Sequence, residues 1–157
     1  LAGMLNADFR IPGSVNYSTL LRVTRFVTKN EQEVYRAYRQ CVFNVIFNNR
    51  DDHAKNFSFL LNENRRWIMS PAYDLTFSDG PNGEHQMDIM SEGKNPGRIH
   101  LMALAEDAGL EKDKCQKIID DILQVAKKFK MSTKKYAIRE KTINEITAVI
   151  AQNIRRF

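Results

Sequence analysis

The chain has 157 residues, of which 43% are hydrophobic and 27% charged, which is typical of one globular domain with a substantial core. No apolar stretch approaches the roughly 20 residues that cross a bilayer, and residues 1–13 lack the basic start and long apolar middle of a signal peptide. The net charge of +5 is uneven: residues 1–110 hold 12 Lys/Arg against 13 Asp/Glu, whereas residues 111–157 hold 12 against 6.

Helical periodicity dominates the first part of the chain. An apolar-periodic segment at 17–28 precedes a stronger helix at 30–48, which Asn30 can cap, with Glu33 three residues later as in a capping box. Cys41 falls among the apolar positions of this helix and is expected in the core. Two cysteines, Cys41 and Cys115, make neither a disulfide framework nor a metal quartet, which fits a reducing, cytoplasmic setting.

A β-hairpin is predicted next. The apolar runs at 57–61 and 66–69 flank a polar turn at 62–65, and Trp67 on the second run is expected in the core or at an interface. A loop with a Gly-Pro-Asn-Gly turn at 80–83 follows. Helices are expected near 97–108, 111–130 and 139–155, with Gly109 as a helix stop. The expected fold class is mainly α, a single domain over residues 1–157 with a small hairpin.

Polar side chains gather at the end of the first strong helix, in "NNRDDHAKNFSF" at 48–59. Asp51 and Asn56 are five residues apart, and Asp74 follows 18 residues later. In protein kinases an Asp accepts the proton of the substrate hydroxyl, while an Asn five residues on and a further Asp bind magnesium. Carboxylate and amide oxygens suit this work because Mg²⁺ prefers hard oxygen ligands.

The hairpin suggests how these side chains meet. If residues 62–65 form the turn, Leu61 faces Arg66 and Asn56 faces Pro71. Asp74 then lies about 10 Å beyond that partner in an extended chain. A bend at Pro71 would bring Asn56 and Asp74 to one metal ion, but this spacing alone is common by chance.

Two stretches together resemble a known family. "NRDDHAKNF" followed by "SPAYDL" is similar to the catalytic loop and the metal-binding segment of the HipA-like bacterial serine/threonine kinases. The matching positions are Asn49, Asp51, His53, Lys55 and Asn56, then Pro71, Tyr73 and Asp74. The resemblance covers roughly residues 20–125 and implies a helical C-terminal kinase lobe, whose hairpin carries the catalytic and metal-binding loops.

The resemblance also implies roles. Asp51 would be the general base, and Asn56 and Asp74 would bind Mg²⁺. His53 and Lys55 would lie near the phosphates of ATP, and Tyr73 would brace Asp74 or touch the nucleotide. We take the likeness of Arg50 to the eukaryotic His-Arg-Asp motif as a coincidence.

A complete kinase also needs a phosphate-covering loop and a strand lysine upstream. Residues 1–50 offer only Gly3, Gly13 and Lys29, so we expect the N-terminal lobe to be absent and the chain alone to be inactive. By resemblance the longer protein would be a toxin of a toxin–antitoxin module. Its partners would be a protein substrate with Ser or Thr and a DNA-binding antitoxin, which allows indirect DNA association, and no membrane.

Other interpretations stay open. Asp51 and Asn56 could be ordinary turn residues, Asp52 is expected to face solvent, and a zinc site at "DDH" finds no matching histidine spacing. The basic helices after residue 110 could be a solvated face, or a non-catalytic module that binds nucleic acid or an antitoxin partner. A degenerate pseudokinase lobe is disfavoured, because the three kinase positions are filled.

Overall fold

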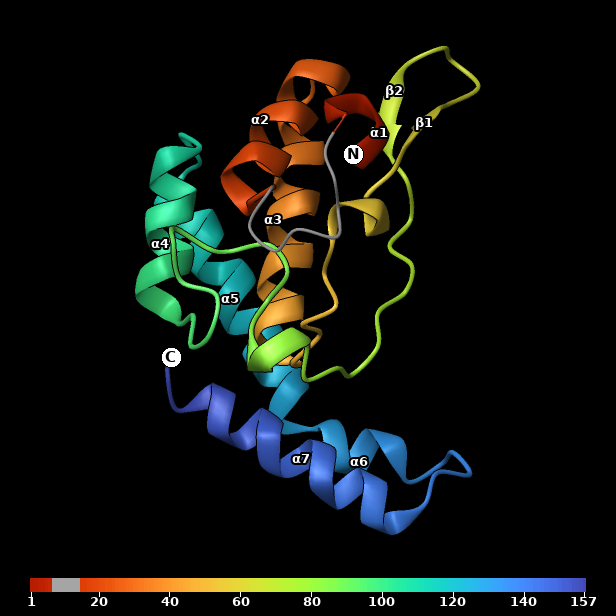
Figure 1. Cartoon of the computed structure of the whole chain (residues 1–157), viewed down its shortest axis with the longest axis vertical. Coiled ribbons are helices and arrows are strands. Elements are labelled where there is room, and N and C mark those ends of the chain that lie inside the picture. Colours follow the sequence, from red (N-terminus) through yellow and green to blue (C-terminus); the bar gives the residue numbers. More distant parts are fainter. Residues whose placement is uncertain (7–14) are drawn as a thin grey trace.

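The computed structural model describes residues 1–6 and 15–157, and the expected mainly α-helical fold with a small sheet is confirmed (Figure 1). Residues 7–13 of the stretch in which we expect no signal peptide lie outside the described residues. Within the described ranges no helix is long and apolar enough to cross a membrane. The helices are α1 (Ala2–Leu5), α2 (Tyr17–Thr28), α3 (Glu31–Ile46), α4 (Arg98–Asp107), α5 (Lys112–Lys127), α6 (Phe129–Thr133) and α7 (Glu140–Ile154), with 3₁₀ turns η1 (Ala54–Asn56) and η2 (Pro81–Gly83).

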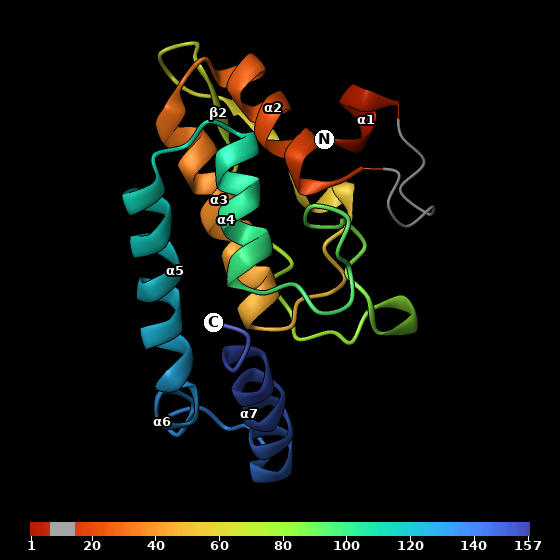
Figure 2. The same ribbon diagram turned by 90° about the vertical axis from the view of Figure 1, so that its left-hand side faces the viewer.

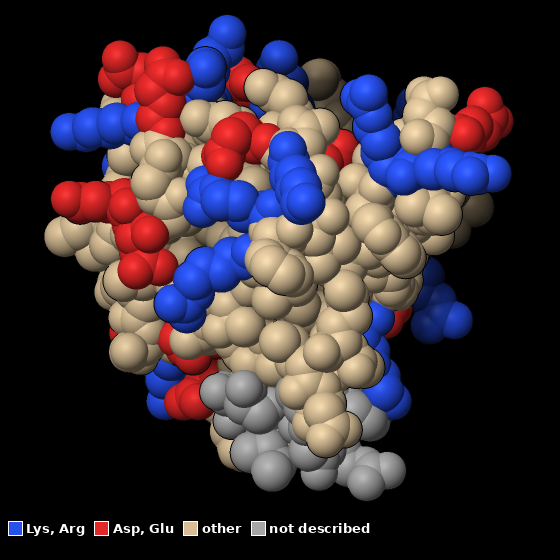
Figure 3. Space-filling view, turned by 90° about the horizontal axis from the view of Figure 1, so that it is seen from above, with Lys and Arg blue, Asp and Glu red and all other residues tan. Residues whose placement is uncertain are grey.

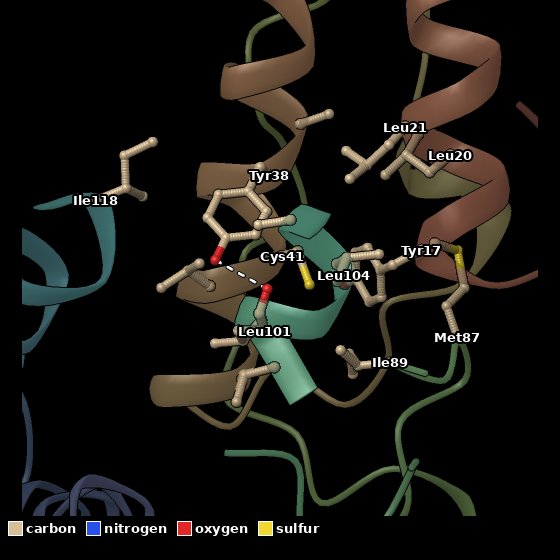
Figure 4. Close-up of a cluster of buried hydrophobic side chains, with 14 of the residues drawn as sticks. Tyr17, Leu20, Leu21, Tyr38, Cys41, Met87, Ile89, Leu101, Leu104 and Ile118 are labelled. Atoms are coloured by element: carbon tan, nitrogen blue, oxygen red, sulfur yellow. Dashed lines mark hydrogen bonds between the residues drawn. The ribbon is translucent and has the colours of Figure 1, made fainter. Parts of the chain in front are cut away.

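Helix α3 is the central element, and α2, α5, α7 and the hairpin pack against it (Figures 1 and 2). Its apolar positions are buried as the helical period predicts. Figure 4 shows the core between α2, α3 and α4, where the Tyr38 hydroxyl donates to the Leu101 carbonyl at 3.1 Å. Cys41 is fully buried there, as expected.

The N-terminus of α3 is built differently from the expected capping box. Asn30 does cap the helix, since its Oδ1 accepts from the Gln32 backbone N–H at 3.0 Å. The Glu33 side chain does not accept from the Asn30 backbone N–H, as a capping box would require. Its Oε2 accepts instead from the Met69 backbone N–H at 2.9 Å and from Arg36 at 2.8 Å, which fastens the hairpin to α3.

The hairpin consists of β1 (Phe59–Leu61) and β2 (Trp67–Met69), and its predicted register is wrong by one residue. Leu61 pairs with Trp67, not with Arg66, because the connection has five residues. The Asn62 Oδ1 accepts from the Arg66 N–H at 2.9 Å, and Arg65 takes a left-handed φ of 55°, which closes this longer turn. Trp67 is 46% exposed and is therefore not a core residue.

The C-terminal helices follow the sequence closely. Gly109 ends α4 as predicted: its φ is +62°, its N–H donates to the Glu106 carbonyl, and the Leu110 N–H donates to the Ala105 carbonyl, which is a Schellman motif. The segment expected as one helix at 111–130 is divided into α5 and the short α6. Helices α6 and α7 then form the lower layer in Figure 1.

Candidate functional site

The polar stretch begins directly after α3. Asn48 takes a left-handed φ of 59°, which turns the chain out of the helix. Asn49 then forms a parallel bridge with Ser78, in which the Arg50 N–H donates to the Ser78 carbonyl at 3.2 Å and the Ser78 N–H to the Asn48 carbonyl at 2.9 Å. The chain after α3 and the chain before η2 therefore lie side by side.

Asp51 and Asn56 are held together by one hydrogen bond. The Asn56 side-chain amide donates to the Asp51 carbonyl at 2.9 Å, and the Asn56 backbone N–H donates to the His53 carbonyl at 2.9 Å within η1. Asn56 is buried, whereas the Asp51 side chain is 48% exposed. This hydrogen bond engages Nδ2 of Asn56, so Oδ1 is the side-chain atom that Asn56 can offer to a ligand. The Asp51 carboxylate stays open to solvent.

The Tyr73–Asp74 segment is fastened to this loop at two points. The Tyr73 hydroxyl donates to the Lys55 carbonyl at 2.6 Å and shares a hydrogen bond with Ser58 Oγ at 2.7 Å. The Asn49 side-chain amide reaches the Asp74 carbonyl at 3.4 Å. Asp74 is exposed and takes a left-handed φ of 53°, a conformation that Asp tolerates better than most residues.

The link between the two halves of the site is thus side chain to backbone, and it differs from the expected hairpin extension. Asn56 belongs to the 3₁₀ turn η1 and not to a strand, so counting residue pairs down the hairpin does not reach it. Tyr73 is the residue that joins the segments. This contact agrees with its expected bracing role, although that role itself stays a prediction.

His53 and Lys55 lie on the same loop. The His53 side chain is 20% exposed, and its Nε2 is 3.9 Å from Asp51 Oδ1, which is longer than a hydrogen bond. Lys55 is exposed. Both residues therefore belong to the same loop as Asp51 and Asn56, and their roles near the nucleotide phosphates stay a prediction.

The prediction that Asp52 faces solvent is wrong, because its side chain is fully buried. Its carboxylate accepts from the Tyr17 hydroxyl at 2.7 Å and from the Gln86 backbone N–H at 2.9 Å, and lies 2.7 Å from His85 Nδ1. The Tyr17 hydroxyl in turn accepts from Asn44 at 2.8 Å. Burial, followed by the Asp52 charge, raises the pKa of Tyr17 well above its usual value.

Sequence reasoning missed this buried cluster, defined as Asn44, Tyr17, Asp52 and His85. Tyr17 and His85 lie 35 and 33 residues from Asp52 in the chain, and no local spacing connects them. Through Asp52, the cluster connects the candidate catalytic loop to α2, to α3 and to the chain after η2.

The residues present suit magnesium better than zinc. Among residues 1–6 and 15–157, no three His, Cys, Asp or Glu side chains gather as a metal-binding group. Asn56 and the exposed Asp74 carboxylate would offer oxygen ligands, and Mg²⁺ is usually bound by one or two such side chains together with water and substrate phosphates.

Comparisons with known proteins bear on the family and the fold of this chain. A structural neighbour is a chain of the Shewanella oneidensis MR-1 toxin–antitoxin complex of HipA, HipB and operator DNA. It superposes with a TM-score of 0.67 and 17% identity over 89% of this chain, which spans 34% of that chain. No curated protein sequence matches. The family model of the HipA-like C-terminal domain matches residues 1–130, and the chain therefore belongs to the HipA-like C-terminal domain family.

Proposed function

We propose that the chain is the catalytic C-terminal lobe of a HipA-like protein serine/threonine kinase, which transfers the γ-phosphoryl group of ATP to a Ser or Thr hydroxyl. The observation that carries the proposal is the double link described above. Asp51 and Asn56 share one hydrogen-bonded loop, and Tyr73 and Asp74 are tied to that same loop although 18 residues separate Tyr73 from Lys55.

Asp51 is the proposed general base. Its half-exposed carboxylate can accept the proton of an incoming hydroxyl, and the Asn56 bond to its carbonyl fixes the backbone that carries it. In phosphoryl transfer, positioning of the nucleophile contributes more than strong basicity.

Asn56 and Asp74 are the proposed Mg²⁺ ligands. Bound Mg²⁺ would neutralise charge on the nucleotide phosphates. Lys55 adds a compact positive charge beside them, His53 lines the same loop, and Tyr73 keeps the Asp74 segment in place.

The remaining kinase parts would come from outside these 157 residues. The phosphate-covering loop and the strand lysine are proposed to lie in an N-terminal lobe of a longer protein, consistent with this chain spanning 34% of the Shewanella chain. By the same likeness we propose a toxin of a toxin–antitoxin module, with a DNA-binding antitoxin as partner.

Kinetics of the longer protein test the proposal. Asp51→Asn should lower phosphoryl transfer to a protein substrate by about 10²-fold or more, with unchanged thermal unfolding. Asn56→Ala and Asp74→Asn should raise the Mg²⁺ concentration needed for half-maximal rate. Glu63→Gln, at the exposed hairpin tip, is the matched control and should keep the parent rate. Full turnover by Asp51→Asn would contradict the proposal.

A second candidate, a nucleic-acid contact by the C-terminal helices, is favoured by the charge distribution. Figure 3 shows the opposite end of the molecule, at the α2–α3 turn and the hairpin tip, where positive and negative side chains are interspersed. The surplus of Lys and Arg lies instead after residue 110. Binding of a short DNA duplex should then weaken steeply between about 50 and 200 mM salt. A flat salt response would exclude this candidate.

A further inference from the structure

A basic cleft lies between the loop that contains η2 and helix α7, and neither Asp51, Asn56 nor Asp74 is among its lining residues. Its volume is about 310 Å³, and Arg50, Lys94 and Arg156 supply its positive charges. In Figure 1, η2 lies just above α7. The other described lining residues are mostly amides and one carboxylate: Asn48, Asn95, Gln152, Asn153 and Asp79, with Gly83 and Val149.

The walls of the basic cleft are fixed by buried contacts. Asn153, 2% exposed, donates to the Val45, Ile46 and Asn48 oxygens at 3.3 Å and thereby anchors α7 beneath α3. A Cβ on Gly97 would come within 2.8 Å of the Arg156 carbonyl, so only glycine permits the close approach of the two chain segments. The walls of the cleft are therefore held in place by contacts between α3, α7 and the segment at Gly97.

The two arginines are oriented but not neutralised. Arg156 Nη1 donates to Asn153 Oδ1 at 3.1 Å, and no carboxylate lies within ion-pair distance of Arg156 among the described residues. Arg50 donates to the carbonyls of Gly83 and Lys94, and its buried Nε has no hydrogen-bond partner there. These bonds hold both guanidinium groups without cancelling their charge.

The charges in the basic cleft repel one another. Burial and then the nearby Arg50 lower the pKa of Arg156, with Glu92 opposing the effect. The Glu92 Oε1 accepts from the Lys94 and Asn95 backbone N–H groups at 2.7 and 2.8 Å, which hold its carboxylate in place, and Glu92 is not one of the lining residues of the cleft. Asp79 is likewise held, by the Asn48 amide at 3.2 Å. A doubly negative ligand between the cations would relieve this repulsion.

We propose that the basic cleft binds a phosphate monoester, held by Arg156 and Lys94 with Arg50 at its inner wall. Arginine and lysine donors in a confined, polar pocket match the charge and oxygen geometry of such a group. A volume of about 310 Å³ admits a phosphoryl group with a small body but not a nucleic-acid duplex. The source is either a phosphorylated side chain or a small phosphorylated metabolite, and the inference does not depend on kinase activity.

Binding of inorganic phosphate to the 157-residue chain, measured by calorimetry and by NMR shifts, tests the proposal. We expect saturable binding with shifts at Lys94, Gln152 and Arg156. Lys94→Gln and Arg156→Gln should each weaken it at least fivefold. Arg155→Gln is the matched control, because it removes the same charge one residue away on an exposed position outside the cleft, and it should change affinity by less than twofold.

Circular dichroism separates lost binding from lost folding, and the exposed Lys94 keeps the test valid if Arg156→Gln unfolds. A phosphoserine peptide and glycerol 3-phosphate distinguish the two sources, and tighter binding of either supports the cleft. Absence of saturable binding, or an equal loss in Arg155→Gln, would overturn the proposal, since a diffuse basic surface would then explain the data.

Discussion

The loop from Asn49 to Asn56 presents an outer face to solvent and an inner face to the core, and two adjacent carboxylates show how differently these faces are built. The Asp51 side chain, on the outer face, is 48% exposed, and its Oδ1 lies 3.9 Å from His53 Nε2. Asp52, on the inner face, is fully buried and surrounded by three donors. Burial without such donors would be costly, so the inner face must be satisfied by the protein, whereas the outer face can stay open for a ligand.

This contrast shows how the core can fix the loop while the loop still carries an exposed carboxylate. The inner contacts come from α2, from α3 and from the chain after η2, and they fix the backbone at Asp52. The backbone of the neighbouring Asp51 is thereby held in place, while its side chain stays 48% exposed. The loop is therefore fixed by its buried face, and its exposed face carries the Asp51 side chain.

The largest expected effect lies on the inner face. Asp52→Ala leaves the Tyr17 hydroxyl, His85 Nδ1 and the Gln86 N–H without their acceptor, and should lower the free energy of unfolding by about 3–5 kcal/mol. Asp51→Ala is the control from the outer face and should change it by about 0.5 kcal/mol or less. Urea denaturation measures both free energies. Similar losses for the two variants would contradict the expected difference between the buried and the exposed carboxylate.

Alkaline pH should have the second largest effect, and it should lower the free energy of unfolding. Burial raises the pKa of Cys115 from 9.0 to about 11, and it raises those of Cys41 and Tyr17 as well. The folded state therefore holds protons that the unfolded state releases, so stability is complete below about pH 9 and falls as pH rises toward 11.

Urea denaturation at pH 7, 9 and 10 measures this dependence. Each such group contributes at most about 1.4 kcal/mol per pH unit. Cys115→Ala should make the decline shallower, while Asp51→Asn should leave the slope as it is. A free energy of unfolding that stays constant to pH 10 would contradict the expectation.

The smallest effect is expected on the outer face. Tyr73→Phe removes the hydroxyl that bonds the Lys55 carbonyl and Ser58, and should cost about 0.5–1.5 kcal/mol of stability. In the longer protein it should also reduce phosphoryl transfer, because the Asp74 segment loses one of its two attachments and keeps only the Asn49 contact. Tyr136→Phe, at an exposed tyrosine on the chain before α7, is the control and should change neither quantity. If Tyr73→Phe kept the activity of the parent protein, the proposed role of Tyr73 in holding the Asp74 segment would be wrong.

Much of the fold was predictable from local pattern. The helical period located α2 and α3, the Asn30 cap marked the start of α3, and Gly109 marked the end of α4. These features depend on residues within one or two turns of each other, so the sequence carries them directly. Residues 49–56 and 71–74 were identified as a candidate site through their joint resemblance to the HipA-like kinases, because their spacing alone is common by chance.

Tertiary structure alone decided how those pieces meet. The five-residue turn shifted the hairpin register by one, Glu33 bonded Met69 in place of its own helix end, and Tyr73 joined Asp74 to the loop. Asp52 was misjudged as exposed for the same reason: its partners lie more than 30 residues away in the chain. Local sequence determines which conformation a segment prefers, but burial and hydrogen bonding between distant segments are fixed only when the chain packs together.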